Sequence, residues 1–331
     1  MTKLELRKFM KAIRVLHAGG PEVMEIAEVP MPLAKVGEAV VKVSVAGVNA
    51  IDGQFRDGSL RTPLPFIPGQ EGAGVVSAAG SQVKVVKVGD RVAWSGALGS
   101  YAEFVAVSAD GLVPVPDAVS EEQAAAVMMH GLTAHYLVND AHKLKAGETA
   151  LVHAAAGGVG LLLVQMARMI GARVVGTASS EEKAKLAREA GAEEVIIFTR
   201  QDFESEVKRL TGGKGVDVVY DGVGKATFEK NLNVLRQRGM LVLYGTSSGP
   251  VPPVDPAKLS EKGSLYMART TLAHFTATRE ELLARTGDLF GMIAEGKLKL
   301  RIAKKYPLAE AAQAHRDMEG RKVAGKLLLM V

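Results

Sequence analysis

Three glycines in the middle of the chain are the residues whose spacing points most directly to chemistry. Gly157, Gly158 and Gly160 follow an apolar run at 150–156 and precede a helix-period run at 161–170. A turn of this kind, between a strand and a helix, offers free backbone N–H groups and the positive end of the helix dipole to an anion. The spacing, with Val159 in the same turn, predicts the pyrophosphate site of a dinucleotide cofactor, and hence redox chemistry.

This glycine motif is imperfect, since Ala155 stands where its first glycine is expected. The alternative is a glycine-rich turn that binds no ligand. We favour the cofactor because the turn lies in a strand–helix–strand unit of about 30 residues, the length typical of nucleotide-binding units.

The composition fits an α/β protein of two domains. The chain has 331 residues, more than one core normally holds, and 47% of them are hydrophobic. The absence of cysteine excludes disulfides and thiolate metal sites and is compatible with a reducing cytoplasm. The net charge of +5 is dispersed, which favours a solvated surface over an anionic partner. No apolar run is long enough to span a membrane, so we expect a cytoplasmic protein in which residues 1–9 form a loose extension.

The spacing of apolar residues separates a β-rich part from an alternating part. Residues 10–125 contain strand runs and many turns, which predicts a partly closed barrel with strands at 40–48, 74–79 and 83–92. Two helices are expected between residues 120 and 142, the second of them starting at Thr133.

Residues 147–268 alternate six strands with helices, which predicts a doubly wound parallel sheet whose sixth strand is 264–268. The segment 250–256 is rich in proline and is expected to be a loop. The last strand, 326–331, is expected to return to the β-rich part.

Several segments together are more specific than the glycine turn. From Met10 onward, the sequence resembles the zinc-free medium-chain dehydrogenase/reductases, specifically the quinone oxidoreductase (zeta-crystallin-like) family. The segments that carry the resemblance are 46–52 (AGVNAID), 68–74 (PGQEGAG), 88–91 (VGDR), 99–103 (GSYAE), 131–133 (GLT), 154–160 (AAAGGVG), 220–224 (YDGVG) and 245–249 (GTSSG).

The resemblance implies a fold, an activity and an assembly. The implied fold is α/β: a GroES-like β-rich catalytic domain, residues 1–127 and 270–331, and a doubly wound (Rossmann) domain, residues 128–269, that binds NADPH. The implied activity is metal-free hydride transfer from NADPH to a quinone. Relatives commonly dimerise, and an uncovered sixth strand would favour a homodimer through that sheet edge.

The resemblance also bears on metal binding. Zinc-dependent relatives place a cysteine in the segment that contains Asn49 and a histidine at the position of Gln70 in this chain. Amides are poor zinc ligands, so no zinc is expected. The spacing of His130, His135 and His142 does not place a pair on one helical turn, and we interpret them as ordinary packed or solvated histidines.

Three residues near the implied nicotinamide position are candidates for the catalytic site. Asn49 would hydrogen-bond the cofactor ribose or a substrate oxygen. Asp52 would relay a proton, or equally would only hold the geometry of its loop. Related enzymes often carry a tyrosine near position 54, and because this chain has Gln54 its proton donor stays open. Arg269 either approaches the substrate or lies on the surface.

The strand that follows the glycine helix predicts NADPH rather than NADH. Its end carries no Asp or Glu that would bind a ribose 2′-hydroxyl, the position about 20 residues beyond the glycine turn where NAD enzymes place one. Ser179, Ser180 and Lys183 would instead hold a 2′-phosphate. By resemblance a tyrosine would join them, and Phe198 stands in its place. The remaining cofactor contacts implied by position are Thr133, Gly157, Gly158, Val159, Gly160, Gly222, Val223, Ser247, Ser248, Leu272 and His274.

Two other functions remain open. An NADPH-dependent reductase of α,β-unsaturated ketones or enoyl thioesters would use the same scaffold. A role of a different class, RNA binding or a crystallin-like structural function, is suggested by some zeta-crystallin relatives, but the sequence has no aromatic-basic RNA-binding motif and nucleic acid is not expected as a partner.

Overall fold

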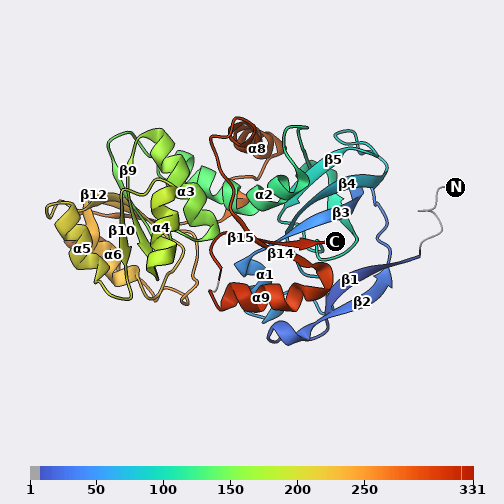
Figure 1. Cartoon of the computed structure of the whole chain (residues 1–331), viewed down its shortest axis with the longest axis horizontal. Coiled ribbons are helices and arrows are strands. Elements are labelled where there is room, and N and C mark those ends of the chain that lie inside the picture. Colours follow the sequence, from blue (N-terminus) through green and yellow to red (C-terminus); the bar gives the residue numbers. More distant parts are fainter. Residues whose placement is uncertain (1–7, 322) are drawn as a thin grey trace. The chain divides into compact units, whose positions relative to one another are not determined.

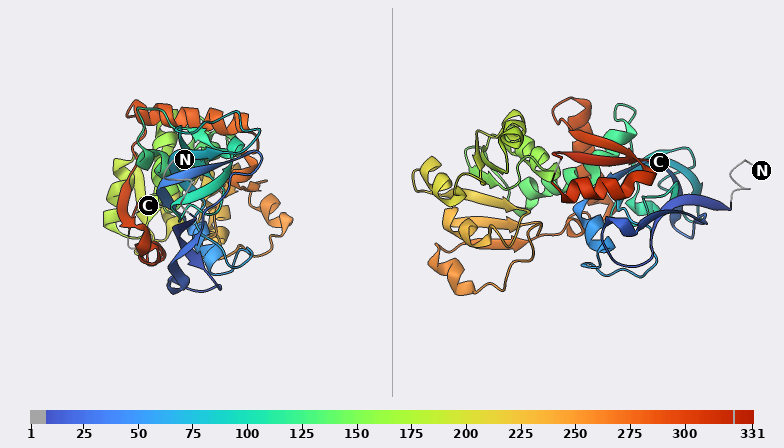
Figure 2. Two further views of the ribbon diagram at one scale, coloured as in Figure 1. Left: turned by 90° about the vertical axis from the view of Figure 1, so that its right-hand side faces the viewer. Right: turned by 60° about the horizontal axis from the view of Figure 1, so that its bottom comes forward.

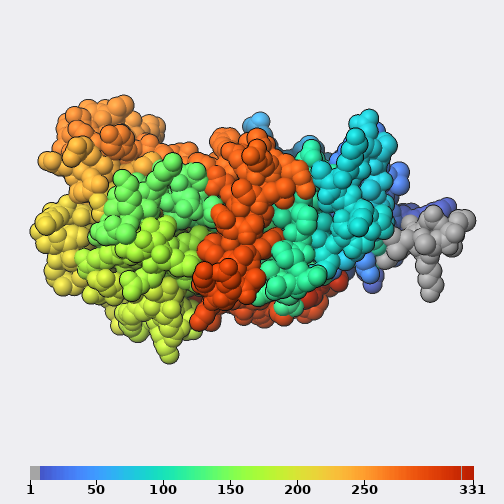
Figure 3. Space-filling model, turned by 90° about the horizontal axis from the view of Figure 1, so that it is seen from above, coloured from blue at the N-terminus to red at the C-terminus, as the bar shows by residue number. Residues whose placement is uncertain are grey.

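The computed structural model describes residues 8–321 and 323–331, which are the coloured parts of Figures 1 and 3. The expected loose extension at 1–9 lies almost wholly outside these described residues. The chain divides into two compact units. We call them the terminal unit (Met1–Met129 with Thr276–Val331) and the central unit (His130–Phe275).

The central unit is built on a parallel six-stranded sheet, as predicted. The strand order among the described residues is β10-β9-β8-β11-β12-β13, so the direction of winding reverses between β8 and β11. These two strands are almost completely buried and mostly apolar, apart from Thr149, Asp217 and Asp221, as is usual for the middle of a sheet covered on both faces. The strands are β8 (Thr149–Val152), β9 (Arg173–Ala178), β10 (Glu194–Ile197), β11 (Val216–Asp221), β12 (Leu235–Leu243) and β13 (Tyr266–Arg269).

Helices cover both faces of this sheet. The helices α3 and α4 pack against each other, as do α5 and α6, and Figure 1 shows the sheet between the two pairs. Ser180 and Asp202 cap α4 and α5 through their side chains, and α3 ends at Gly171 in a left-handed conformation that glycine adopts without strain. The helices are α3 (Gly158–Ile170), α4 (Glu181–Glu189), α5 (Phe203–Leu210), α6 (Phe228–Val234) and α7 (Pro256–Glu261).

The terminal unit is centred on β3, which pairs with β4, β6 and β15. Because β15 pairs antiparallel with β3, the last strand returns to the β-rich part, as predicted. Figure 2 (right) shows α9 lying along β14 and β15. The strands are β1 (Phe9–Val15), β2 (Met24–Pro30), β3 (Glu38–Val48), β4 (Glu71–Ala79), β5 (Arg91–Ser95), β6 (Phe104–Ser108), β7 (Val113–Pro114), β14 (Ile302–Pro307) and β15 (Lys326–Met330), and the helices are α1 (Ala50–Arg56), α8 (Arg279–Ala294) and α9 (Ala311–Glu319).

Two sequence-based expectations are wrong, and a third holds only in part. The run 83–92 is a strand only from Arg91, because left-handed residues at Gln82 and Gly89 turn the chain away from extended structure. One continuous helix, α2 (Glu121–Tyr136), replaces the two helices expected, since burial of its alanine-rich length overrides the weak propensity of Gly131. The proline-rich loop is present at 250–255, but its last proline, Pro256, starts α7, because proline suits the first turn of a helix.

No helix among the described residues has the length and apolar character needed to cross a membrane.

Candidate active site

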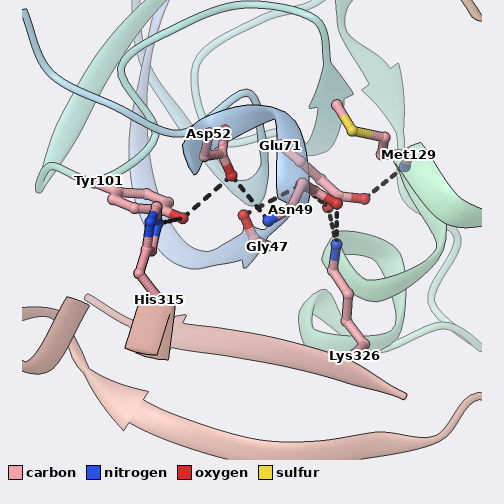
Figure 4. A network of polar contacts seen from close by, with 8 residues as sticks. All are labelled: Gly47, Asn49, Asp52, Glu71, Tyr101, Met129, His315 and Lys326. Carbon is pink, nitrogen blue, oxygen red and sulfur yellow. Dashed lines mark hydrogen bonds and ion pairs between the residues drawn. The ribbon is translucent and has the colours of Figure 1, made fainter. Parts of the chain in front are cut away.

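A buried ion pair lies at the centre of the terminal unit (Figure 4). The Lys326 ammonium, at the start of β15, contacts Glu71 Oε2, at the start of β4, and both residues are almost fully buried. Lys326 Nζ also donates to Asn49 Oδ1 at 2.7 Å, and Asn49 Nδ2 donates to Glu71 Oε2 at 2.9 Å. The backbone N–H of Met129 donates to the other Glu71 oxygen at 2.5 Å. A side chain at Gly47 would place its Cβ 2.1 Å from Glu71 Oε2, so the pair requires glycine there.

These contacts define what Asn49 can still do. Its amide oxygen faces an ammonium and its amide nitrogen faces a carboxylate, so the orientation of the group is fixed. Asn49 is also only 2% exposed, which leaves little of its surface for a ribose or a substrate. The predicted role of Asn49 therefore stays a prediction.

The same cluster is a poor zinc site. Its donors are an amide and a carboxylate whose Oε2 is already neutralised by an ammonium, and the chain has no cysteine. Among residues 8–321 and 323–331, no three His, Asp or Glu side chains gather as metal ligands would.

Asp52 lies on α1 beside this cluster and is fully buried. Its Oδ2 accepts the backbone N–H of Asn49 at 2.9 Å and the hydroxyl of Tyr101 at 3.2 Å, whereas its Oδ1 has no hydrogen-bond partner in the described part of the chain. Burial raises the pKa of Asp52 from 3.8 to about 7, and the hydrogen bonds offset only part of that effect. Gln54 follows on the same helix and is partly buried.

A chain of hydrogen bonds extends from Asp52 through Tyr101 and His315 to Arg56 (Figure 4 shows the first three). Arg56 can only donate, so its 2.9 Å contact makes His315 Nδ1 an acceptor and leaves the proton on Nε2. Nε2 then donates to the Tyr101 hydroxyl at 3.1 Å, which donates to Asp52. Burial lowers the pKa of His315 to about 3, which keeps this imidazole neutral.

The direction of these bonds limits what Asp52 can do. The chain ends at a guanidinium that forms an ion pair with Glu319 at 2.8 Å, and a guanidinium does not give up a proton in proteins. A proton cannot leave Asp52 along this route. The arrangement supports the interpretation of Asp52 as a residue that holds the geometry of its loop.

In the central unit the glycine turn has the form expected of an anion site. Gly157 is the N-cap of α3, no side chain caps the helix, and its first turn has no acidic residue. A Cβ at Gly160 would lie 2.3 Å from the carbonyl oxygen of Ala154, so this position requires glycine, and a Cβ at Gly158 would lie 2.2 Å from the His130 ring and would displace that side chain. Helix N–H groups, Val159 among them, are thereby left for a phosphate. The described geometry fits the pyrophosphate of a dinucleotide.

The residues predicted to hold a 2′-phosphate come together at the carboxyl ends of β9 and β10. Ser179 and Ser180 follow β9, and the Ser180 hydroxyl accepts the backbone N–H of Lys183 at 3.3 Å. Phe198 follows β10, its N–H donates to Ala178 O at 3.1 Å, and its side chain is 47% exposed. An exposed aromatic side chain at this edge is available to a ligand.

The other predicted cofactor residues fall into three places. Ser247 N and Ser248 N donate to the carbonyls of Gly222 and Val223, which joins the loops after β11 and β12. The Ser248 hydroxyl also donates to Val223 O at 2.7 Å, so this side chain holds the loops together. The remaining residues are Thr133, which is buried on α2, and Leu272 and His274, which form a short 3-10 turn after β13.

Sequence reasoning missed the polar partners of these candidates. Glu71, Tyr101, His315 and Lys326 were not predicted to belong to the site. One signal was visible, since Lys326 opens an otherwise apolar strand, KLLLM. A charge in such a strand is unusual and calls for a buried partner.

A parallel doubly wound sheet with a glycine turn, together with a β-rich unit, is typical of the dinucleotide-dependent oxidoreductases. Two family models match the chain, the alcohol dehydrogenase GroES-like domain at residues 35–117 and the zinc-binding dehydrogenase at residues 158–286. The quinone oxidoreductase of Pseudomonas aeruginosa is 44% identical over 97% of this chain and 99% of its own length. The chain therefore belongs to the quinone oxidoreductases of the medium-chain dehydrogenase/reductase family.

Two further relatives widen the comparison. The crystal structure of Escherichia coli quinone oxidoreductase complexed with NADPH has a TM-score of 0.93 and 41% identity, covering 98% of this chain and 99% of that one. A 2-haloacrylate reductase from a Burkholderia species is 39% identical over 96% of this chain and 98% of its own length. The predicted family, fold class and oxidoreductase character are confirmed.

Proposed function

We propose that the protein is an NADPH-dependent quinone oxidoreductase. The observation that carries this proposal is the uncapped, acid-free start of α3 at a turn of three glycines, in a chain that matches quinone oxidoreductases over nearly its whole length. NADPH, when bound, supplies the hydride. A quinone needs no metal to polarise it, because the charge that arrives with the hydride is delocalised over the ring.

In this proposal the central unit binds the cofactor and the terminal unit contributes the substrate site. The N–H groups at the start of α3 bind the pyrophosphate, and Ser179, Ser180 and Lys183 bind the 2′-phosphate. Asn49 orients the substrate or ribose, and Lys326 and Glu71 fix the orientation of its amide. A cytoplasmic location is part of the same proposal.

The test is NADPH consumption by the purified protein with a simple para-quinone and an α,β-unsaturated ketone in parallel, each compared with NADH. Rapid NADPH loss with the quinone supports the proposal. Loss only with the ketone moves the function to alkene reduction, the second candidate, which the similarity to a 2-haloacrylate reductase favours. If the protein binds NADPH without turnover and also binds RNA with a salt-sensitive affinity, the non-enzymatic role is supported instead.

Replacing Lys183 by Glu should raise the KM for NADPH at least about tenfold and leave the KM for NADH nearly unchanged, because the new carboxylate would repel the 2′-phosphate. Steady-state kinetics with both cofactors measure this. The matched control is Lys185→Glu on the same helix, where the lysine is 75% exposed and lies 4.0 Å from Glu189. If both variants behave alike, Lys183 does not belong to the pocket.

The edge strand β13 supports a homodimer. It is the last strand of the sheet, and Tyr266 and Met267 are 61% and 37% exposed. An open edge with exposed apolar side chains favours pairing with a second copy. Light scattering should give the mass of a dimer for the protein and of a monomer for the double variant Tyr266→Lys/Met267→Lys. A monomeric mass for the unmodified protein contradicts the dimer.

A further inference from the structure

A second buried polar network lies beneath the point where the winding of the parallel sheet reverses. The strands on either side of that point are β8 and β11. His153 directly follows β8, and Asp221 is the last residue of β11. Asn231 of α6 joins them. Its Oδ1 lies 2.7 Å from His153 Nε2, and its Nδ2 lies 2.8 Å from Asp221 Oδ2. All three side chains are at most 1% exposed.

The position of each proton in this network follows from which groups can donate and which can accept. A carboxylate only accepts, so the Asn231 amide directs its NH2 to Asp221 and its oxygen to His153. His153 therefore carries its proton on Nε2, and its Nδ1 accepts from the Thr177 hydroxyl at 3.0 Å. Burial lowers the pKa of His153, in agreement with a neutral ring.

At one end, the network holds the start of the glycine turn. Thr177 accepts the N–H of Ala154 through its hydroxyl at 3.3 Å and the N–H of Ala155 through its carbonyl at 3.0 Å. Ala154 has a left-handed backbone, φ +49°, which a residue with a side chain adopts only when its surroundings impose it. Thr177 thus fixes the conformation that brings Gly157 to the start of α3.

At the other end, the network holds the loop after β11. Asp221 Oδ1 accepts the N–H groups of Val223 and Gly224 at 2.6 and 3.2 Å, and Oδ2 accepts the Thr227 hydroxyl at 2.7 Å. In open α/β sheets the ligand lies in the crevice at the carboxyl ends of the strands where the winding reverses. The network therefore connects the two sides of the place where a dinucleotide binds.

We propose that Thr177, His153, Asn231 and Asp221 are positioning residues that set the spacing between the glycine turn and the loop 222–224, and through it the affinity for NADPH. This inference rests on the proposed function only in the identity of the cofactor. A purely structural role would lower stability and leave affinity unchanged.

The experiment uses two isosteric variants, Thr177→Val at one end of the network and Asn231→Leu beside the other end. We expect the Kd for NADPH, measured by calorimetry, to rise about tenfold or more in each, the size expected when a buried donor or acceptor loses its partner. Thr177→Ser should restore the affinity because it keeps the hydroxyl. The control is Tyr220→Phe on β11. It removes a buried hydroxyl that has no hydrogen-bond partner among the described residues.

Hydrogen exchange of the ligand-free variants gives a readout that needs neither cofactor nor activity. Each variant should speed amide exchange in both loops, at 154–155 and at 223–224, although it alters only one end of the network. Exchange that rises only beside the substituted residue, or an unchanged Kd in variants that have lost stability, overturns the proposal. Because neither readout uses a quinone, a failure of quinone reduction is distinguishable from a failure of this inference.

Discussion

Lys326→Met should lower the free energy of unfolding by about 3–5 kcal/mol, the cost of leaving a buried partner charge uncompensated. Glu71 is fully buried, and once the ammonium is gone its carboxylate keeps only the N–H donors of Met129 and Asn49. Urea unfolding followed by circular dichroism measures the loss. The matched control is Lys304→Met on the neighbouring strand, where the lysine is half-exposed and 3.4 Å from Asp317, and this change should cost at most about 1 kcal/mol.

A second substitution distinguishes an uncompensated charge from lost packing. In the double variant Glu71→Gln/Lys326→Met both charges of the pair are gone, and the glutamine can still accept the N–H of Met129. The double variant should therefore be more stable than Lys326→Met alone. A double variant that is no more stable than Lys326→Met would show that the loss does not come from the uncompensated Glu71 charge.

The parts of this protein that could be predicted are those that local sequence patterns determine. The glycine turn, the six alternating strands and the parallel sheet depend on residues close together in sequence, and the structure has them where they were expected. Even there, tertiary packing decided one case, because burial carries α2 straight through Gly131.

The partners in the Lys326–Glu71 cluster and in the Asp52–Tyr101–His315 chain could not be predicted in this way. Lys326 and Glu71 are 255 residues apart, and Tyr101 and His315 are 214 apart, so no local pattern joins them. Their meeting depends on the pairing of β15 with β3, which only the folded sheet sets. Likewise, the sequence gives no sign of the guanidinium at the end of the hydrogen-bond chain of Asp52, which now favours one of its two predicted roles.

The hydrogen-bond chain from Asp52 to Arg56 contains two groups whose burial predicts opposite responses of stability to pH. The pKa of His315 falls from 6.5 to about 3 on folding, so below pH 6.5 the unfolded chain binds a proton that the native protein refuses, and stability is lost on acidification. The pKa of Asp52 rises from 3.8 to about 7, so the native protein keeps a proton that the unfolded chain releases, and stability is lost as the pH rises from about 4 to 7. Tyr101 joins these two groups, and Arg56 and Glu319 are the charged groups beyond His315.

Single substitutions should separate the two responses. Between pH 7 and pH 5, Asp52→Asn should lose about 2 kcal/mol more stability than the unmodified protein, because only the histidine response remains. His315→Asn should lose about 2 kcal/mol less over the same interval, because only the carboxyl response remains. His153, whose pKa is also lowered by burial, adds equally to all three proteins and cancels in the comparison.

Urea unfolding at pH 5, 6 and 7 measures these differences, with His17→Asn, at an exposed histidine outside the network, as the control that should follow the unmodified protein. If Asp52→Asn and His315→Asn shift in the same direction, the two groups do not titrate independently. The proton would then be shared along Tyr101, and Asp52 would regain the relay role that the guanidinium at the end of the chain argues against.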